Sequence, residues 1–247
     1  MAVYGESALL DSPSTLSPFG TLELCLFVTL KMTGLEITNL TLRLDSRTLI
    51  DLLNLHIPGG QVTTVMGPSG SGKSSLLAWL CGTLDPVFSV SGSVMLNGRR
   101  LNGFPPEQRR MGILFQDDLL FPHLSAGENL AFALPRRFRG QSRMQKVAEA
   151  LETIELPGYA DHDPARLSGG QRARVALMRT LLAEPEALLL DEPFSKLDQA
   201  LRERFRSLVF THARQRNLPV LLVTHDPADA EAAEGAVIRI GDAPANT

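Results

Sequence analysis

The sequence predicts an α/β fold with a mainly parallel sheet, an N-terminal antiparallel β-subdomain and an inserted α-helical subdomain. Two short runs, 187–190 and 220–223, are continuously apolar, which is typical of parallel strands buried on both faces. Helical patterns alternate with these strands, and this alternation favours a parallel sheet. Near the start, 35–44 and 49–57 alternate between apolar and polar residues, which predicts two antiparallel strands joined by the turn Asp45-Ser46-Arg47.

The remaining elements are predicted in chain order from the same patterns. A β-branched run at 61–66 is expected to be a buried strand, and the segment 92–96 is followed by the turn Asn97-Gly98. The other expected elements are a strand at 111–115, a helical pattern at 126–156, a helix from Ser168 to Leu181, a helix at 201–216, a short Ala-rich helix and a strand at 236–240. The helical block at about 117–181 forms the inserted subdomain, and Asn129, Arg136 and Arg137 interrupt its apolar pattern.

Composition and charge describe an ordinary soluble globular protein. The 247 residues are 44% hydrophobic and 21% charged, and the net charge of −3 gives no general attraction to nucleic acid or anionic lipid. Cys25 and Cys81 form no metal-ligand pattern and no disulfide framework. No apolar run approaches the roughly 20 residues that cross a bilayer, so a cytoplasmic chain that reaches the membrane through a partner is expected.

The two ends of the chain are expected to lie outside the folded domain. Residues 1–31 are a loose Ser- and Pro-rich segment without a helical or strand period, which predicts a poorly ordered tail or a start codon placed too early. Residues 32–241 are expected to form the single domain, and 242–247 a short tail.

A glycine-rich loop between a predicted strand and a predicted helix is the strongest chemical signal. Its glycines let backbone N–H groups line an anion-binding concavity, Lys73 can reach the β- and γ-phosphates of a nucleotide, and the Ser74 hydroxyl can bind Mg²⁺. The helix that follows points its positive end at the phosphates. The residues expected to bind the nucleotide are Gly67, Pro68, Ser69, Gly70, Ser71, Gly72, Lys73, Ser74 and Ser75.

An acidic pair follows the apolar strand at 187–190. Asp191 would hold Mg²⁺, directly or through water, and Glu192 would polarise the attacking water. A plain acidic turn at a strand end is the alternative.

A second anion-binding helix start is predicted at Ser168-Gly169-Gly170-Gln171. Ser168 suits the N-cap, and two glycines let the first N–H groups approach an anion closely. One loop suffices for one nucleotide, so this second site is either a plain capped helix or needs another explanation.

Across 35–240 the chain closely resembles the ATP-binding cassette (ABC) family. The ordered motifs are the phosphate loop 67–74, Gln116 after an apolar strand, Leu167–Gln171, Leu188–Glu192, the loop Ser195-Lys196-Leu197-Asp198, and His225 after a strand. The resemblance implies a P-loop NTPase (RecA-like) core that binds ATP and Mg²⁺.

The resemblance also implies roles for single residues. Two copies would form a head-to-tail homodimer in which each ATP lies between one phosphate loop and the other copy's Ser168–Gln171. Gln116 would sense Mg²⁺ and the attacking water, His225 would contact the γ-phosphate and orient the water with Glu192, and Asp198 would communicate across the dimer. Ser74, Gln116 and Asp191 would thus surround the metal.

One departure concerns the adenine. The family usually places an aromatic residue near the turn after the first strand, but Leu44 and Asp45 stand there, with no aromatic residue nearby in sequence. An aliphatic contact would lose stacking worth about 1–3 kcal/mol, so ATP and GTP are expected to bind within about tenfold of each other.

The segment 115–124 resembles that of compact bacterial importer ATPases of the thiamine type. The resemblance implies two membrane-spanning permease subunits, a periplasmic or extracellular solute-binding protein, no nucleic acid, and a peripheral place on the cytoplasmic side of the inner membrane. Leu119, Leu120 and Phe121 would be exposed contacts for a permease helix, or else core residues. An ABC ATPase acting on ribosomes or DNA and a catalytically inactive regulatory subunit remain the alternative functions.

Overall fold

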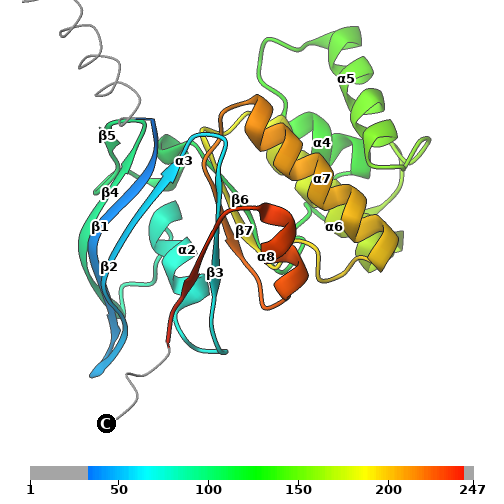
Figure 1. Ribbon diagram of the computed structural model, residues 1–247. Helices are drawn as coiled ribbons and strands as arrows, with labels where there is room; N and C mark the ends of the chain where they lie inside the picture. Colours follow the sequence, from blue (N-terminus) through cyan, green and yellow to red (C-terminus); the bar gives the residue numbers. More distant parts are fainter. Residues whose placement is uncertain (1–32, 242–247) are drawn as a thin grey trace, which may run out of the picture. The chain divides into compact units, whose positions relative to one another are not determined.

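The computed structural model describes residues 33–241, which contain two β-sheets with helices packed between and beside them (Figure 1). The predicted tails 1–31 and 242–247 lie outside the described residues. The predicted fold class is confirmed: one sheet is antiparallel, the other is parallel, and a group of helices is inserted into the parallel one.

The antiparallel sheet has the strand order β2-β1-β4-β5. Its strands are β1 (Gly34–Leu44), β2 (Arg47–Pro58), β4 (Phe88–Leu96) and β5 (Arg99–Arg100). Because Arg47 pairs with Leu44, the turn between β1 and β2 contains only Asp45 and Ser46, one residue fewer than predicted. Asp45 has φ 50°, a left-handed conformation that Asp tolerates in tight turns.

The parallel sheet has the order β6-β7-β8-β3-β9. Its strands are β6 (Met111–Leu114), β7 (Ala187–Asp191), β8 (Val220–Val223), β3 (Val62–Met66) and β9 (Ala236–Arg239). All neighbouring pairs run parallel. Because these strands run parallel, the carboxyl ends of β3, β7 and β8 lie at the same edge of the sheet, where ligands bind in open α/β folds.

Both faces of the parallel sheet are buried, each in its own apolar core. Ala187 and Leu189 of β7 face the core that contains helix α2 (Lys73–Cys81) and the antiparallel sheet. Leu188 and Leu190 face the opposite core, with the longer helices. Successive side chains of a strand point to opposite faces, which explains why β7 is apolar at every one of these positions. Figure 1 shows α2 between the two sheets.

The inserted helices lie between β6 and β7 in the chain. They are α4 (Ala126–Ala133), α5 (Gly140–Thr153) and α6 (Gly169–Leu182). The helical pattern predicted at 126–156 is thus divided, because Leu134 is extended and precedes Pro135, and a residue before proline avoids the helical conformation. The other helices are α3 (Pro106–Arg109), η1 (Pro164–Arg166), α7 (Gln199–Gln215) and α8 (Pro227–Ala233).

No helix within residues 33–241 is both long and apolar enough to cross a bilayer.

Candidate functional site

A cavity of about 590 Å³ lies at the ends of β3, β7 and β8, beside the start of α2. It brings together residues that are far apart in the sequence. The predicted site residues that line it are Gly67, Ser69, Gly70, Gly72, Lys73, Ser74, Ser75, Gln116, Asp191, Glu192 and His225.

The phosphate loop is shaped by close backbone approaches. A Cβ on Gly67 would lie 2.2 Å from the Ile240 carbonyl oxygen, so only glycine fits. Gly70 and Gly72 have φ of 76° and 95°, which side chains rarely tolerate. Gly72 is also the N-cap of α2, and no side chain caps this helix. The first N–H groups of α2 therefore remain available to an anion in the cavity.

The side chains of Lys73 and Ser71 lie against backbone atoms of the phosphate loop itself. The Lys73 ammonium donates hydrogen bonds to the Gly67 and Pro68 carbonyl oxygens, at 2.7 Å and 2.8 Å. Ser71 is buried and does not line the cavity. Its side chain packs close to Gly67 and Gly241, so any direct contact of Ser71 with a phosphate is made by its backbone.

Asp191 and Ser74 meet at the base of the cavity. Ser74 Oγ donates to Asp191 Oδ2 at 3.0 Å. The pKa of Asp191 is raised above its ordinary value, mainly because the carboxyl group is buried. The hydrogen bond from Ser74 lowers this pKa, and the neighbouring negative charge of Glu192 raises it. A cation at this place would offset the cost of burying the carboxylate.

These two oxygens fit Mg²⁺, which takes oxygen ligands and is usually held by one or two protein groups together with phosphate oxygens. Within residues 33–241 no cluster of three or more His, Cys, Asp or Glu side chains could hold a metal. Two protein oxygens would leave the rest of the Mg²⁺ coordination shell to other oxygen ligands, such as phosphate oxygens and water.

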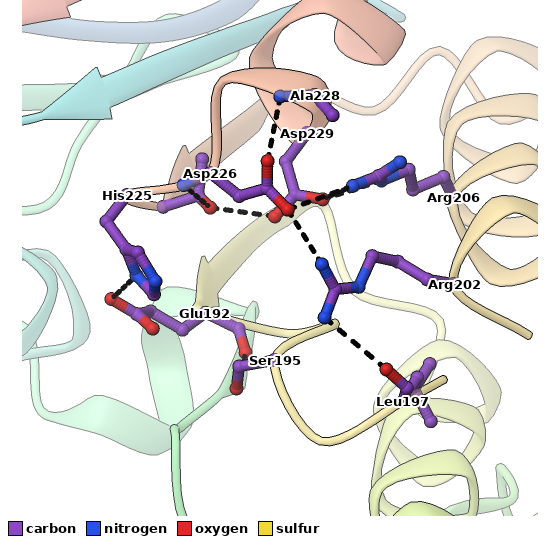
Figure 2. Close-up of polar contacts among 10 residues, drawn as sticks. Glu192, Ser195, Leu197, Arg202, Arg206, His225, Asp226, Ala228 and Asp229 are labelled. Atoms are coloured by element: carbon purple, nitrogen blue, oxygen red, sulfur yellow. Dashed lines mark hydrogen bonds and ion pairs between the residues drawn. The ribbon is translucent and has the colours of Figure 1, made fainter. Parts of the chain in front are cut away.

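Glu192 and His225 form a pair beside Asp191. His225 Nδ1 lies 2.8 Å from Glu192 Oε1, and the His225 side chain is 71% exposed whereas that of Glu192 is 18% exposed (Figure 2). Glu192 has φ 48°, and its N–H donates to the Val223 carbonyl at 2.9 Å. Its own carbonyl accepts from Ser195 Oγ at 2.9 Å. A strained residue held by such bonds is typical of functional sites.

A polar network behind His225 was not predicted from the sequence. Asp226 caps α8 through the Ala228 N–H and also accepts from Arg202 Nη1 at 2.7 Å. Arg202 in turn donates to the Leu197 carbonyl, next to Asp198 (Figure 2). The network thus connects the loop of His225 with the loop of Asp198.

A buried ion pair extends this network one turn along α7. Arg206 Nε donates to Asp229 Oδ1 at 2.6 Å, and Asp229 Oδ2 accepts from Thr224 Oγ1 at 2.7 Å. Arg202 and Arg206 are four residues apart, so they share one face of α7. That spacing, together with Asp226-Pro227 as a helix start, is the sequence signal from which the network could have been found.

Other predicted residues do not line this cavity. Ser168 and Gln171 form a capping box, in which Ser168 Oγ accepts from the Gln171 N–H and Gln171 Oε1 accepts from the Ser168 N–H. Asp198 is the N-cap of α7 and accepts from the Leu201 N–H at 3.0 Å. The start of α6 nevertheless has room for a ligand, because a Cβ on Gly169 would meet only one atom, 3.9 Å away.

The side chain of Asn129 binds the backbone of the segment after Gln116. The sequence indicated Asn129 only as a polar residue that interrupts an apolar helical pattern. Asn129 is fully buried and binds the backbone N–H and carbonyl of Phe121 through its amide, as well as two further carbonyl oxygens. Leu119 is 57% exposed, while Leu120 and Phe121 are half-buried. The structure therefore favours the exposed-contact alternative for Leu119.

The cavity lining also contains an aromatic ring that the residues near Leu44 in the sequence did not indicate. Leu44 lines the cavity as predicted, but Asp45 does not, and an aromatic ring, Phe88, lines it together with Leu44. Phe88 pairs with Leu44 although 44 positions separate them, so no local sequence signal indicated this contact.

The comparisons agree with this geometry. The family model described as ABC transporter matches residues 50–195, and the chain belongs to this family. A solved dimeric bacterial ABC transporter cassette, MJ0796, superposes with a TM-score of 0.72 at 31% identity, covering 83% of this chain and 94% of that one.

Two relatives of known sequence are similar to most of this chain. The uncharacterized ABC transporter ATP-binding protein YnjD of Escherichia coli (strain K12) is 50% identical, over 79% of this chain and 90% of that protein. The thiamine import ATP-binding protein ThiQ of Vibrio vulnificus (strain YJ016) is 44% identical, over 72% of this chain and 76% of that protein. The chain spans only 55% to 58% of the length of several other import ATP-binding relatives.

Proposed function

We propose that this protein is the ATP-hydrolysing subunit of an ABC importer and energises uptake of a small solute through separate membrane subunits. The observation that supports it best is the cavity itself. One space is lined by the phosphate loop, by the Ser74–Asp191 pair and by the Glu192–His225 pair. These are the groups that nucleotide binding, metal binding and activation of water require.

Each group has a proposed role in hydrolysis. The loop N–H groups and Lys73 bind the β- and γ-phosphates. Ser74 and Asp191, together with Gln116 of the same cavity, would hold Mg²⁺, which would neutralise phosphate charge. Glu192 accepts the proton of the attacking water, and His225, hydrogen-bonded to Glu192, orients that water and contacts the γ-phosphate. A regulatory subunit without hydrolysis is the less favoured function, because it would not need the Glu192–His225 pair.

The protein is proposed to act as a head-to-tail homodimer. At the start of α6, Ser168 is exposed and Gly169, Gly170 and Gln171 are half-buried, and none of the four lines this chain's own cavity. A second copy facing the first in the opposite orientation would place that helix start against the γ-phosphate. Asp198, at the start of α7, would then lie at the contact between the copies.

Disulfide crosslinking tests the homodimer. Ser69→Cys and Gly169→Cys are introduced into a chain whose two native cysteines have been replaced, and Glu192→Gln is added to trap ATP. A covalent dimer is expected with ATP and Mg²⁺ under oxidising conditions, and much less without nucleotide. Ser207→Cys, on the exposed part of α7, replaces Gly169→Cys in the matched control. If the Ser69–Gly169 pair never joins two chains, the head-to-tail dimer is wrong.

The proposed partners are two permease subunits and a periplasmic or extracellular solute-binding protein. The ATPase would lie on the cytoplasmic side of the inner membrane as a peripheral subunit. The names of the relatives include thiamine, Fe(3+) and spermidine/putrescine import, so they support uptake without selecting one solute.

Leu119→Arg tests the contact with the permease. Leu119 is exposed and lies three residues after Gln116 in the sequence. A charge at this position would have to be desolvated in an apolar interface with the permease. We expect the amount of ATPase that co-purifies with the permease from detergent-solubilised membranes to fall at least tenfold. ATP binding by the free protein should stay unchanged. Met144→Arg, at a more exposed apolar residue on α5, is the control. Equal loss in both variants, or none in either, would contradict the assignment.

A further inference from the structure

Three residues from three strands form a row across the antiparallel sheet. Leu44, the last residue of β1, pairs with Arg47, the first of β2, and with Phe88, the first of β4. Residues directly opposite each other in antiparallel strands point to the same face. All three side chains accordingly line the cavity that the phosphate loop lines.

The position of Phe88 is fixed by its own turn. Its N–H donates to the Asp85 carbonyl at 3.0 Å, and the Val87 N–H donates to Asp85 Oδ1 at 2.9 Å. The ring packs against the core that holds α2 yet keeps part of its surface in the cavity. Phe88 therefore offers part of an aromatic ring to a planar ligand in the cavity.

Arg47 is the polar member of the row. Its side chain is exposed, and in the described part of the chain no hydrogen bond or ion pair holds the guanidinium. A guanidinium stacks on aromatic surfaces and can donate to acceptor atoms at the edge of a base. Arg47 and Phe88 thus combine the two chemistries by which proteins bind nucleobases.

The row lies at a suitable place relative to the phosphate loop. Leu49, two residues after Arg47, adjoins the loop so closely that a Cβ on Gly72 would lie 3.1 Å from the Leu49 Cβ. A triphosphate bound at the start of α2 therefore has the row beside it within the same cavity. Glu192 and His225 also line this cavity.

We propose that the row Arg47–Leu44–Phe88 is the base-binding platform of this ATPase and that Phe88 stacks on the purine. The stacking ring comes from β4 and not from the turn that follows β1. The platform rests on the proposed function, since it requires a nucleoside triphosphate in the cavity. Because every base has an aromatic face, this platform accepts adenine and guanine alike.

Binding of ATP, GTP and inorganic tripolyphosphate, each with Mg²⁺, tests the proposal by calorimetry on the full-length protein. Phe88→Ala is expected to weaken ATP and GTP about tenfold or more and to change tripolyphosphate less than twofold. Phe88→Tyr is expected to retain wild-type affinities. The control is Val87→Ala, next to Phe88 but outside the cavity lining, which should change none of the three.

Arg47→Met separates base recognition from phosphate binding. We expect ATP affinity to fall about threefold, from loss of a cation–π contact, with tripolyphosphate unchanged. If tripolyphosphate weakens as much as ATP, Arg47 binds phosphate and its place in the platform is wrong.

The outcomes for the platform and for the proposed function are distinguishable. If Phe88→Ala leaves ATP unchanged, or weakens ATP and tripolyphosphate equally, the platform is wrong. If wild type binds neither ATP nor tripolyphosphate, the proposed nucleotide site itself fails.

Discussion

Glu192→Gln is expected to lower ATP turnover by about 10²- to 10⁴-fold while ATP still binds. The amide keeps the shape of the side chain, but it cannot accept the proton of the attacking water. The left-handed backbone at Glu192 and its hydrogen bonds to Val223 and Ser195 do not involve the carboxylate, so the local structure should persist. Phosphate release in single-turnover experiments, together with ATP affinity, measures the effect.

The control for this variant is Glu203→Gln, at an exposed position of α7. Its turnover should equal that of wild type. If Glu192→Gln retains more than about a tenth of wild-type turnover, Glu192 is not the general base. If wild type itself shows no ATPase, even with its membrane partners, the regulatory function replaces the proposed one.

Asp229→Ala is expected to destabilise the protein by about 3–5 kcal/mol. Arg206 and Asp229 have side chains only 10% and 5% exposed, and removal of the carboxylate would leave the buried guanidinium with only its longer 3.5 Å contact to Asp226, and Thr224 Oγ1 without its acceptor. For a domain of this size each kcal/mol corresponds to about 2–4 °C in Tm, so a fall of roughly 10 °C is expected in thermal unfolding.

Glu149→Ala is the matched control, because it removes an exposed ion pair with Lys146 within α5. Exposed ion pairs contribute little because water screens their charges, so its Tm should change little. The double variant Arg206→Met/Asp229→Ala should recover part of the loss, since no unpaired charge remains buried. Similar stability in Asp229→Ala and Glu149→Ala would contradict the importance assigned to the buried pair.

The sequence by itself determined the elements whose signals are local. The continuous apolar runs predicted β7 and β8 because both of their faces are buried in separate cores. The glycine pattern predicted the phosphate loop because Gly70 and Gly72 adopt left-handed backbone conformations, which are a local property of the chain. Ser168 predicted the start of α6 because an N-cap side chain acts within the first turn of its own helix.

Only the tertiary structure decided which distant residues meet. Phe88 reaches Leu44 through the register of β1 and β4, and Arg202 and Arg206 reach Asp226 and Asp229 through the packing of α7 on α8. Such contacts depend on strand pairing and helix packing over long separations, which the residue types near each position do not encode. Local propensities and patterns act over a few residues, so they specify elements and caps, whereas the cavity arises from the arrangement of those elements in space.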